Sequence, residues 1–104
     1  MSVIESFLSQ LTDYNGIFIS AKPNVWIVKF PKNGTDFCLE ELQKFVGGHI
    51  EVVYFDDYLM IINEEGKLNQ LPVNFMASTL YQSYYGETDY IVGDCLICKN
   101  ALVK

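Results

Sequence analysis

The amino-acid sequence predicts a single α+β domain, with about three helices packed on a mixed or mainly antiparallel sheet. The chain has 104 residues, the size of one ordinary domain, and half of them are apolar, which is enough to bury a core without metal or disulfide support. Segments with strand-like composition come in pairs between segments with helical spacing. This order favours an α+β sandwich, and we expect the helices to cover one face of the sheet.

Residues 1–15 predict a helix that precedes the rest of the domain. Apolar side chains recur there three and four positions apart, which is the spacing of one helical face. They are Ile4, Phe7, Leu8 and Leu11. Asn15-Gly16 is expected to end this helix. Two β-rich segments follow at 16–20 and 24–30, and Lys22-Pro23 between them favours a hairpin.

A second helix is expected to begin at Thr35 or Asp36, either of which is a good N-cap, and to run through Phe45. Its apolar side chains are expected to form a buried stripe, while its charged side chains face water. The stripe is Leu39, Leu42, Phe45 and Val46, and the water-facing residues are Glu40, Glu41 and Lys44. Gly47-Gly48 ends the helix, and we expect one of the two glycines to have a positive φ angle, with Val46 and Ile50 buried.

Three strands are expected next. Residues 49–55 and 58–63 form two of them, with Asp56-Asp57 between. The turn at 63–66 favours a left-handed conformation at Gly66 and leads to a short third strand at 67–69.

The last two elements are a helix and a long strand. Either Pro72 occupies the first turn of a helix, where proline is favoured, or Asn74 caps the helix, which is expected to run to about Tyr84. Since an aspartate also caps well, we expect Asn74→Asp to keep most of the stability. The final strand is expected over Tyr90–Cys98, with Gly93-Asp94 as a bulge.

Four motifs follow one another between Val46 and Asp94. They are VGG-x-IE at 46–51, NEEGK at 63–67, LP-x-N at 71–74 and I-x-GD at 91–94. In this pattern the chain resembles a small bacterial domain family of unknown function, carried largely by phages, plasmids and integrative elements. The resemblance covers residues 24–98 and leaves the helix in residues 1–15 as an addition to this core. The length of the chain predicts one domain over 1–104.

Charge argues against nucleic acid as a partner. Thirteen acidic residues stand against seven lysines, the net charge is −6, and the sequence contains no arginine. Arginine is the usual reader of guanine edges and phosphates, and an acidic surface repels a phosphate backbone. We therefore expect no direct contact with nucleic acid.

The spacing of the cysteines and carboxylates argues against a metal site and against a catalytic residue. Cys95 and Cys98 are spaced C-x-x-C, but in a strand this spacing directs the two side chains to opposite faces. The acidic pairs at 56–57 and 64–65 are expected at opposite ends of one strand. Glu51 with Asp94 is the carboxylate pair that an enzyme would use, yet nothing in the spacing requires it. We expect no cofactor and no enzymatic activity.

The remaining candidates are binding residues. His49, Glu51 and Asn74 are candidates for contact with a small ligand, and the tyrosines at positions 81, 84 and 85 are candidates for contact with a protein. The sequence favours a protein partner, in a non-catalytic accessory protein of a mobile genetic element. A protein that binds or sequesters a nucleotide or metabolite is the alternative. Homo-oligomer formation stays open.

The expected location is the cytoplasm, without membrane contact. No apolar segment approaches the roughly 18 to 20 residues that a spanning helix needs, and the start MSVIESFLSQ lacks the basic residues of a signal peptide. Three cysteines leave one unpaired, which fits reduced thiols better than a secreted disulfide framework.

Overall fold

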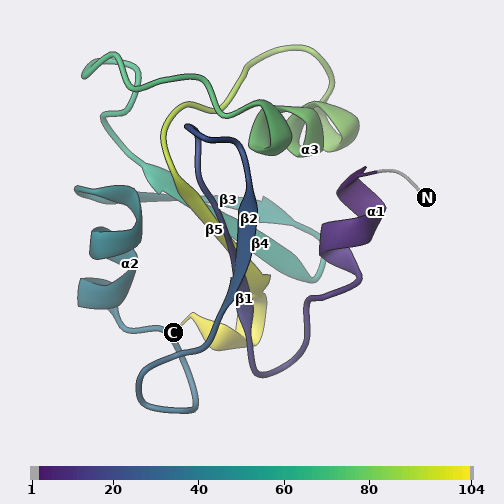
Figure 1. Ribbon diagram of the computed structural model, residues 1–104, viewed down its shortest axis with the longest axis vertical. Helices are drawn as coiled ribbons and strands as arrows, with labels where there is room; N and C mark the ends of the chain where they lie inside the picture. The colour runs from purple at the N-terminus through teal and green to yellow at the C-terminus, as the bar shows by residue number, and fades with distance from the viewer. Residues whose placement is uncertain (1–2, 104) are drawn as a thin grey trace.

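A computed structural model describes residues 3–103 and confirms a single α+β domain built on one antiparallel sheet (Figure 1). The elements are α1 (Val3–Leu8), β1 (Gly16–Ile19), β2 (Trp26–Lys29), α2 (Leu39–Val46), β3 (Ile50–Phe55), β4 (Tyr58–Asn63), α3 (Phe75–Tyr85), β5 (Cys95–Lys99) and a 3-10 turn, η1 (Asn100–Leu102). Over these residues no helix is long and apolar enough to cross a membrane.

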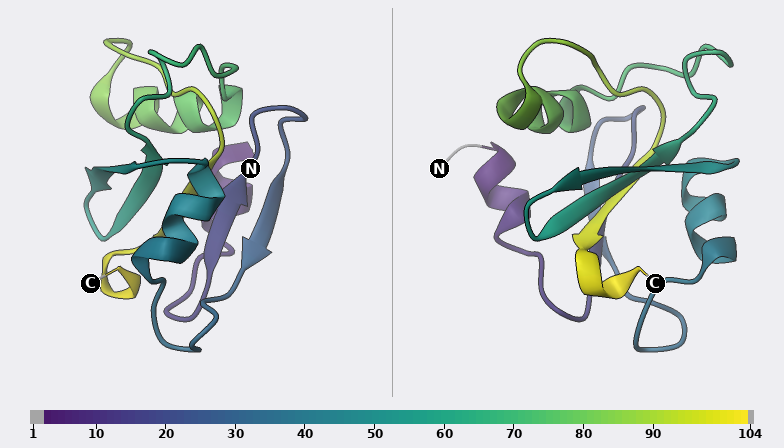
Figure 2. Two further views of the ribbon diagram at one scale, coloured as in Figure 1. Left: turned by 90° about the vertical axis from the view of Figure 1, so that its left-hand side faces the viewer. Right: turned by 180° about the vertical axis from the view of Figure 1, so that it is seen from behind.

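The sheet has the strand order β2-β1-β5-β4-β3, and every neighbouring pair is antiparallel. Two sequence-local hairpins, β1-β2 and β3-β4, therefore lie on either side of the last strand (Figure 2). Because β5 is central, the chain completes the sheet only when its final strand inserts between the hairpins. The two edges of the sheet are β2 and β3.

Helices cover both faces of the sheet, so the expectation of a single covered face is wrong. Helices α1 and α3 lie over one face and α2 over the other (Figure 1). The reason is visible in β5, whose first four residues, Cys95–Cys98, are all buried. Side chains of a strand alternate between faces, so a strand buried at every position needs a layer on each side. Cys95 and Ile97 belong to the α1/α3 core, and Leu96 and Cys98 to the α2 core.

Helix α2 begins later than expected, at Leu39 with Cys38 as its N-cap. Thr35 and Asp36 do not cap it, because their backbone N–H groups donate to the Asn33 side-chain oxygen in the preceding turn, at 2.8 and 2.9 Å. A local side-chain bond of this kind competes with helix formation.

The same late start reverses two predicted orientations on α2. Glu41 is buried, because its carboxylate accepts hydrogen bonds from the backbone N–H of Lys32 (2.9 Å) and of Cys38 (3.2 Å). Leu39, expected in the buried stripe, is 57% exposed. The carboxylate that closes the helix start therefore takes the inward position, and the apolar side chain faces solvent.

The predicted end of α2 is confirmed. Gly47 is the C-cap residue with φ of 78°, and its N–H donates to the Gln43 carbonyl. Val46 is buried as expected, whereas Ile50 is only partly buried, because β3 is an edge strand.

We expect Gly47→Ala to lower the free energy of unfolding by about 1 kcal/mol, the ordinary cost of a left-handed conformation for a residue with a Cβ. The added Cβ would meet no atom within 4 Å, so the loss is conformational and not steric. Urea unfolding measures it. Gly47→Asn should lose less, since asparagine tolerates this conformation. An alanine variant as stable as the parent would contradict the account of the helix end.

The segments around the third helix differ from expectation in three ways. Residues 67–69 form turns and not a strand, and the final strand is β5 alone, because Gly93 has φ of 77° and breaks the extended run. Gly66 does not have positive φ; the left-handed residue of this segment is Gln70. A glycine at 66 is needed for space, since a Cβ there would lie 2.9 Å from Val92.

Candidate functional site

A cleft of about 440 Å³ lies beside the β3 edge of the sheet. One wall is β3 itself, from Glu51 to Tyr54. The opposite walls are the C-terminal half of α3 and the segments 64–68 and 89–92. Its lining combines apolar, aromatic and charged side chains, a mixture typical of binding clefts.

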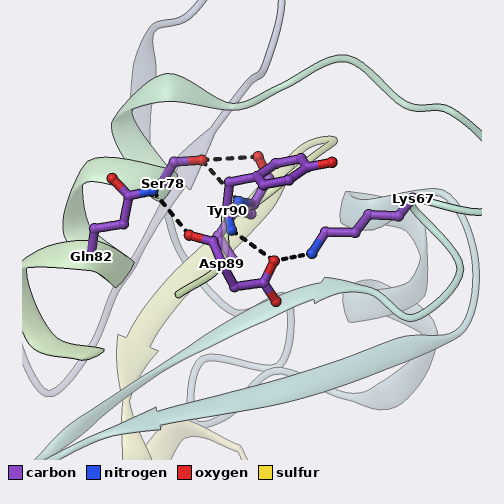
Figure 3. A network of polar contacts seen from close by, with 6 residues as sticks. Lys67, Ser78, Gln82, Asp89 and Tyr90 are labelled. Atoms are coloured by element: carbon purple, nitrogen blue, oxygen red, sulfur yellow. Dashed lines mark hydrogen bonds and ion pairs between the residues drawn. The ribbon is translucent and has the colours of Figure 1, made fainter. Parts of the chain in front are cut away.

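The wall formed by residues 89–92 is held against α3 by polar contacts (Figure 3). The Ser78 hydroxyl accepts a hydrogen bond from the Ile91 N–H (2.8 Å) and donates one to the Ile91 carbonyl (3.1 Å). One turn further on, the Gln82 amide donates to the Asp89 carbonyl (2.9 Å). The chain that leaves α3 is thus folded back along its own helix, which places Asp89 and Tyr90 at the cleft.

Lys67 connects this wall to the segment that follows β4 (Figure 3). Its ammonium group donates to the Asp89 carboxylate and lies 4.4 Å from the centre of the Tyr90 ring. The hydrogen bond from Lys67, together with one from the Tyr90 N–H, lowers the pKa of Asp89 below its usual value. Because both side chains of the ion pair are about half exposed, it contributes little stability. Its effect is to occupy the lysine that lines the cleft.

Tyrosines at the end of α3 join the helix to the β3-β4 hairpin. The Tyr81 and Tyr85 rings are stacked with centres 4.9 Å apart, and the buried Phe55 packs against Tyr84 and Tyr85 at 5.3 and 5.7 Å. The Tyr85 hydroxyl donates to the Tyr54 carbonyl. The Tyr84 hydroxyl donates to the Asp56 carboxylate (2.8 Å), which raises the pKa of Tyr84.

The structure brings together some of the residues that the sequence singled out. Glu51, Tyr81 and Tyr85 line the cleft. Tyr84 lies outside it, against Asp56. His49 is exposed and also outside the lining, with its Nδ1 atom 4.0 Å from the Glu65 carboxylate.

Sequence reasoning missed Lys67, Leu68, Asp89 and Tyr90, which line the cleft as well. Lys67 belongs to the NEEGK motif, but the composition of this motif was fully explained by a turn, so its lysine was not considered as a binding residue. Nothing in the sequence marks Asp89 as its partner.

Asn74 is a structural residue. Its side chain is fully buried and accepts a hydrogen bond from the Ala77 N–H (3.1 Å), which confirms the predicted N-cap. Its amide group also donates to the carbonyls of Ile19 (3.0 Å) and Gly93 (2.9 Å). An aspartate has no amide to donate, so the expectation that Asn74→Asp keeps most of the stability no longer holds.

Cys95 and Cys98 lie on opposite faces of β5, as predicted, each within a hydrophobic core. Burial raises the pKa of both thiols, that of Cys98 to about 12. Asp94 accepts a hydrogen bond from the Ala21 N–H (2.9 Å) and borders a different pocket from Glu51, so these carboxylates do not form a pair. Within residues 3–103, no three His, Cys, Asp or Glu side chains are grouped to hold a metal ion.

The architecture and the cleft define a small α+β domain with a cleft at one edge of its sheet. Residues 18–102 match the model of the domain of unknown function DUF3846, and the chain belongs to this family. The match extends beyond the span 24–98 over which the motifs suggested a resemblance. Searches of curated proteins and of solved structures found no match to the chain.

Proposed function

We propose that the protein is a non-catalytic interaction protein that binds another protein through the cleft beside β3. One observation carries the proposal: the cleft lies along an edge strand, and Tyr81, Tyr85 and Tyr90 line it from the walls opposite that strand. Tyrosines are enriched in protein interfaces because they combine a large apolar surface with a polar end.

The ionisable groups of the cleft support binding over catalysis. The lowered pKa of Asp89 keeps its carboxylate charged, as a partner for Lys67 and not as a proton donor. No cysteine of the described chain lines the cleft, and the raised pKa values of Cys95 and Cys98 disfavour the thiolate that a nucleophile needs.

The wider setting of the proposal is an accessory protein of a mobile genetic element that acts in the cytoplasm. The order of the four motifs supports the mobile element, because they resemble those of a family carried largely by phages and plasmids. The odd number of cysteines, with two of them buried as free thiols, supports a reducing compartment.

Binding or sequestering of a small ligand is a second candidate function. The cleft volume of about 440 Å³ favours it, since pockets for small molecules commonly measure 300–1,000 Å³. A nucleotide is the less favoured ligand of this class, because Lys67 is already paired with Asp89 and the cleft also contains Glu51 and Glu64.

A site-specific crosslinking experiment separates the two functions. A photoreactive amino acid replaces Leu68, which lines the cleft and is 78% exposed, or Phe30, which is 67% exposed beyond the opposite edge strand. We expect covalent protein adducts in host cells from position 68 and none from position 30. Equal adducts from both positions, or none from either while a metabolite and nucleotide panel raises the melting temperature, would contradict the protein-binding function.

A further inference from the structure

The cleft exposes backbone hydrogen-bonding groups of β3. This strand pairs with β4 on one side and, within residues 3–103, has no strand neighbour on the other. Two contacts show which residues point outward. The His49 carbonyl points inward, toward the β4 side, because it accepts from the Glu64 N–H. The Tyr54 carbonyl points outward, away from β4, because it accepts from the Tyr85 hydroxyl.

Backbone orientation alternates along an antiparallel strand, so the outward residues of β3 are Ile50, Val52 and Tyr54. Tyr85 already occupies the outward carbonyl of Tyr54. The N–H and C=O of Val52 therefore point sideways from the edge of the sheet, away from β4, at the middle of the strand. Val52 itself lines the cleft. A single residue of an added antiparallel strand would pair with both groups, whereas in an added parallel strand the residues before and after the facing one would pair with them.

The other edge of the sheet is less suited to strand addition. Strand β2 has four residues and is flanked by Pro23 and Pro31, which have no N–H to donate. Prolines near an edge strand are a common protection against pairing with other chains. Strand β3 has six residues and contains no proline.

The charge of the cleft selects the kind of chain that can enter. Its lining contains the carboxylates of Glu51, Glu64 and Asp89 and one ammonium group, that of Lys67, which is bound to Asp89. Glu51 and Glu64 are left to meet a partner. A second copy of this chain would bring one acidic cleft against another, in a protein whose net charge is −6.

We propose that the cleft binds an extended, basic segment of a partner protein, which adds to β3 as an additional antiparallel or parallel strand. This inference rests on the proposed function and specifies its partner. The main chain of the segment pairs with Val52, its lysine or arginine side chains meet Glu51 and Glu64, and its apolar side chains pack on Tyr81 and Tyr85. The Tyr85 hydroxyl, on the Tyr54 carbonyl, marks the end of the paired region.

The test begins with decapeptides selected against the whole protein from a random display library. We expect the selected peptides to be rich in lysine and arginine. N-methylation of alternate residues in one register should weaken binding about tenfold or more, by removing main-chain donors, while the other register tolerates it. Glu51→Lys should weaken binding to a similar extent. Glu87→Lys, an exposed residue outside the cleft lining, is the matched control.

Amide hydrogen exchange then locates the added strand. The Val52 amide should exchange at least about tenfold more slowly with peptide bound, because it gains a hydrogen bond, while the Val53 amide, which already pairs with β4, should not change. Two results together would overturn strand addition and leave protein binding at the cleft intact. They are an exchange rate of the Val52 amide that is the same with and without peptide, and a loss of peptide binding in Tyr81→Ala. Selection of acidic peptides, or of none, would overturn the basic segment. If a higher protein concentration slowed exchange of the Val52 amide without any peptide, the added strand would come from a second copy of this chain. This result would overturn the basic segment of another protein as the partner.

Discussion

Asn74→Ala is expected to lower the free energy of unfolding by about 3–5 kcal/mol, a large part of the stability of a domain of this size. The substitution leaves the Ala77 N–H and the carbonyls of Ile19 and Gly93 without the side-chain partner that they have in a fully buried site. Each such group costs about 1–3 kcal/mol, although the costs do not add in full. Urea unfolding followed by Trp26 fluorescence measures the loss.

Two further variants separate the cap from the buried donor. Asn74→Ser keeps an N-cap oxygen of similar quality, so it would match the parent if capping were the whole role; we expect it to lose about 2 kcal/mol or more. Asn74→Asp places a carboxylate against two carbonyls, which raises its folded pKa. Its stability should therefore improve relative to the parent as the pH is lowered, since a protonated carboxyl can donate one hydrogen bond. If Asn74→Ser were as stable as the parent, the hydrogen bonds that the Asn74 amide donates to the Ile19 and Gly93 carbonyls would not contribute to stability.

Asn74 shows why sequence reasoning reached the cap and missed the rest. Capping is local: the LP-x-N motif places the asparagine three residues before the N–H that it accepts from. The two donated bonds reach Ile19 and Gly93, 55 and 19 positions away. They depend on how the β1-β2 hairpin packs against the start of α3, and no local pattern encodes that arrangement.

The same distinction applies to the fold. The hairpins and the end of α2 were predictable, because each depends on a few adjacent residues such as Gly47. The second covered face was not, because it follows from the insertion of β5 between the hairpins. The apolar run Cys95–Cys98 is compatible with burial on both faces, but it was expected only as the end of a longer strand, Tyr90–Cys98, with a bulge at Gly93-Asp94.

The cleft assembles from segments that are far apart in sequence. Lys67 and Asp89 are separated by 22 positions, and the Tyr85 hydroxyl reaches back 31 positions to the Tyr54 carbonyl. Sequence composition identified the tyrosines and Glu51 as candidates, since exposed aromatic and acidic side chains stand out individually. Their convergence on one edge strand required the packing of α3 over the sheet.

Phe55→Ala is expected to lower the free energy of unfolding by about 3–5 kcal/mol, the usual result of removing a buried aromatic ring. Phe55 is 1% exposed, stacks on Tyr58 with ring centres 5.0 Å apart and packs against Tyr84 and against Tyr85, of which Tyr85 lines the cleft. Loss of the ring should also reduce the near-ultraviolet circular dichroism of the tyrosines, because they lose their common neighbour.

Phe75→Ala is the matched control, since it makes the same chemical change at a side chain that is 69% exposed. We expect a change within about 0.5 kcal/mol, as for most surface substitutions. The difference between the two variants thus measures how much the buried position of Phe55 contributes to stability, because the residue type and the substitution are the same. If Phe55→Ala lost no more stability than Phe75→Ala, the hairpin end would not be packed beneath α3, and the cleft wall formed by Tyr85 would not be held in place. A large loss with an unchanged tyrosine signal would instead show that Phe55 stabilises the core without positioning the rings.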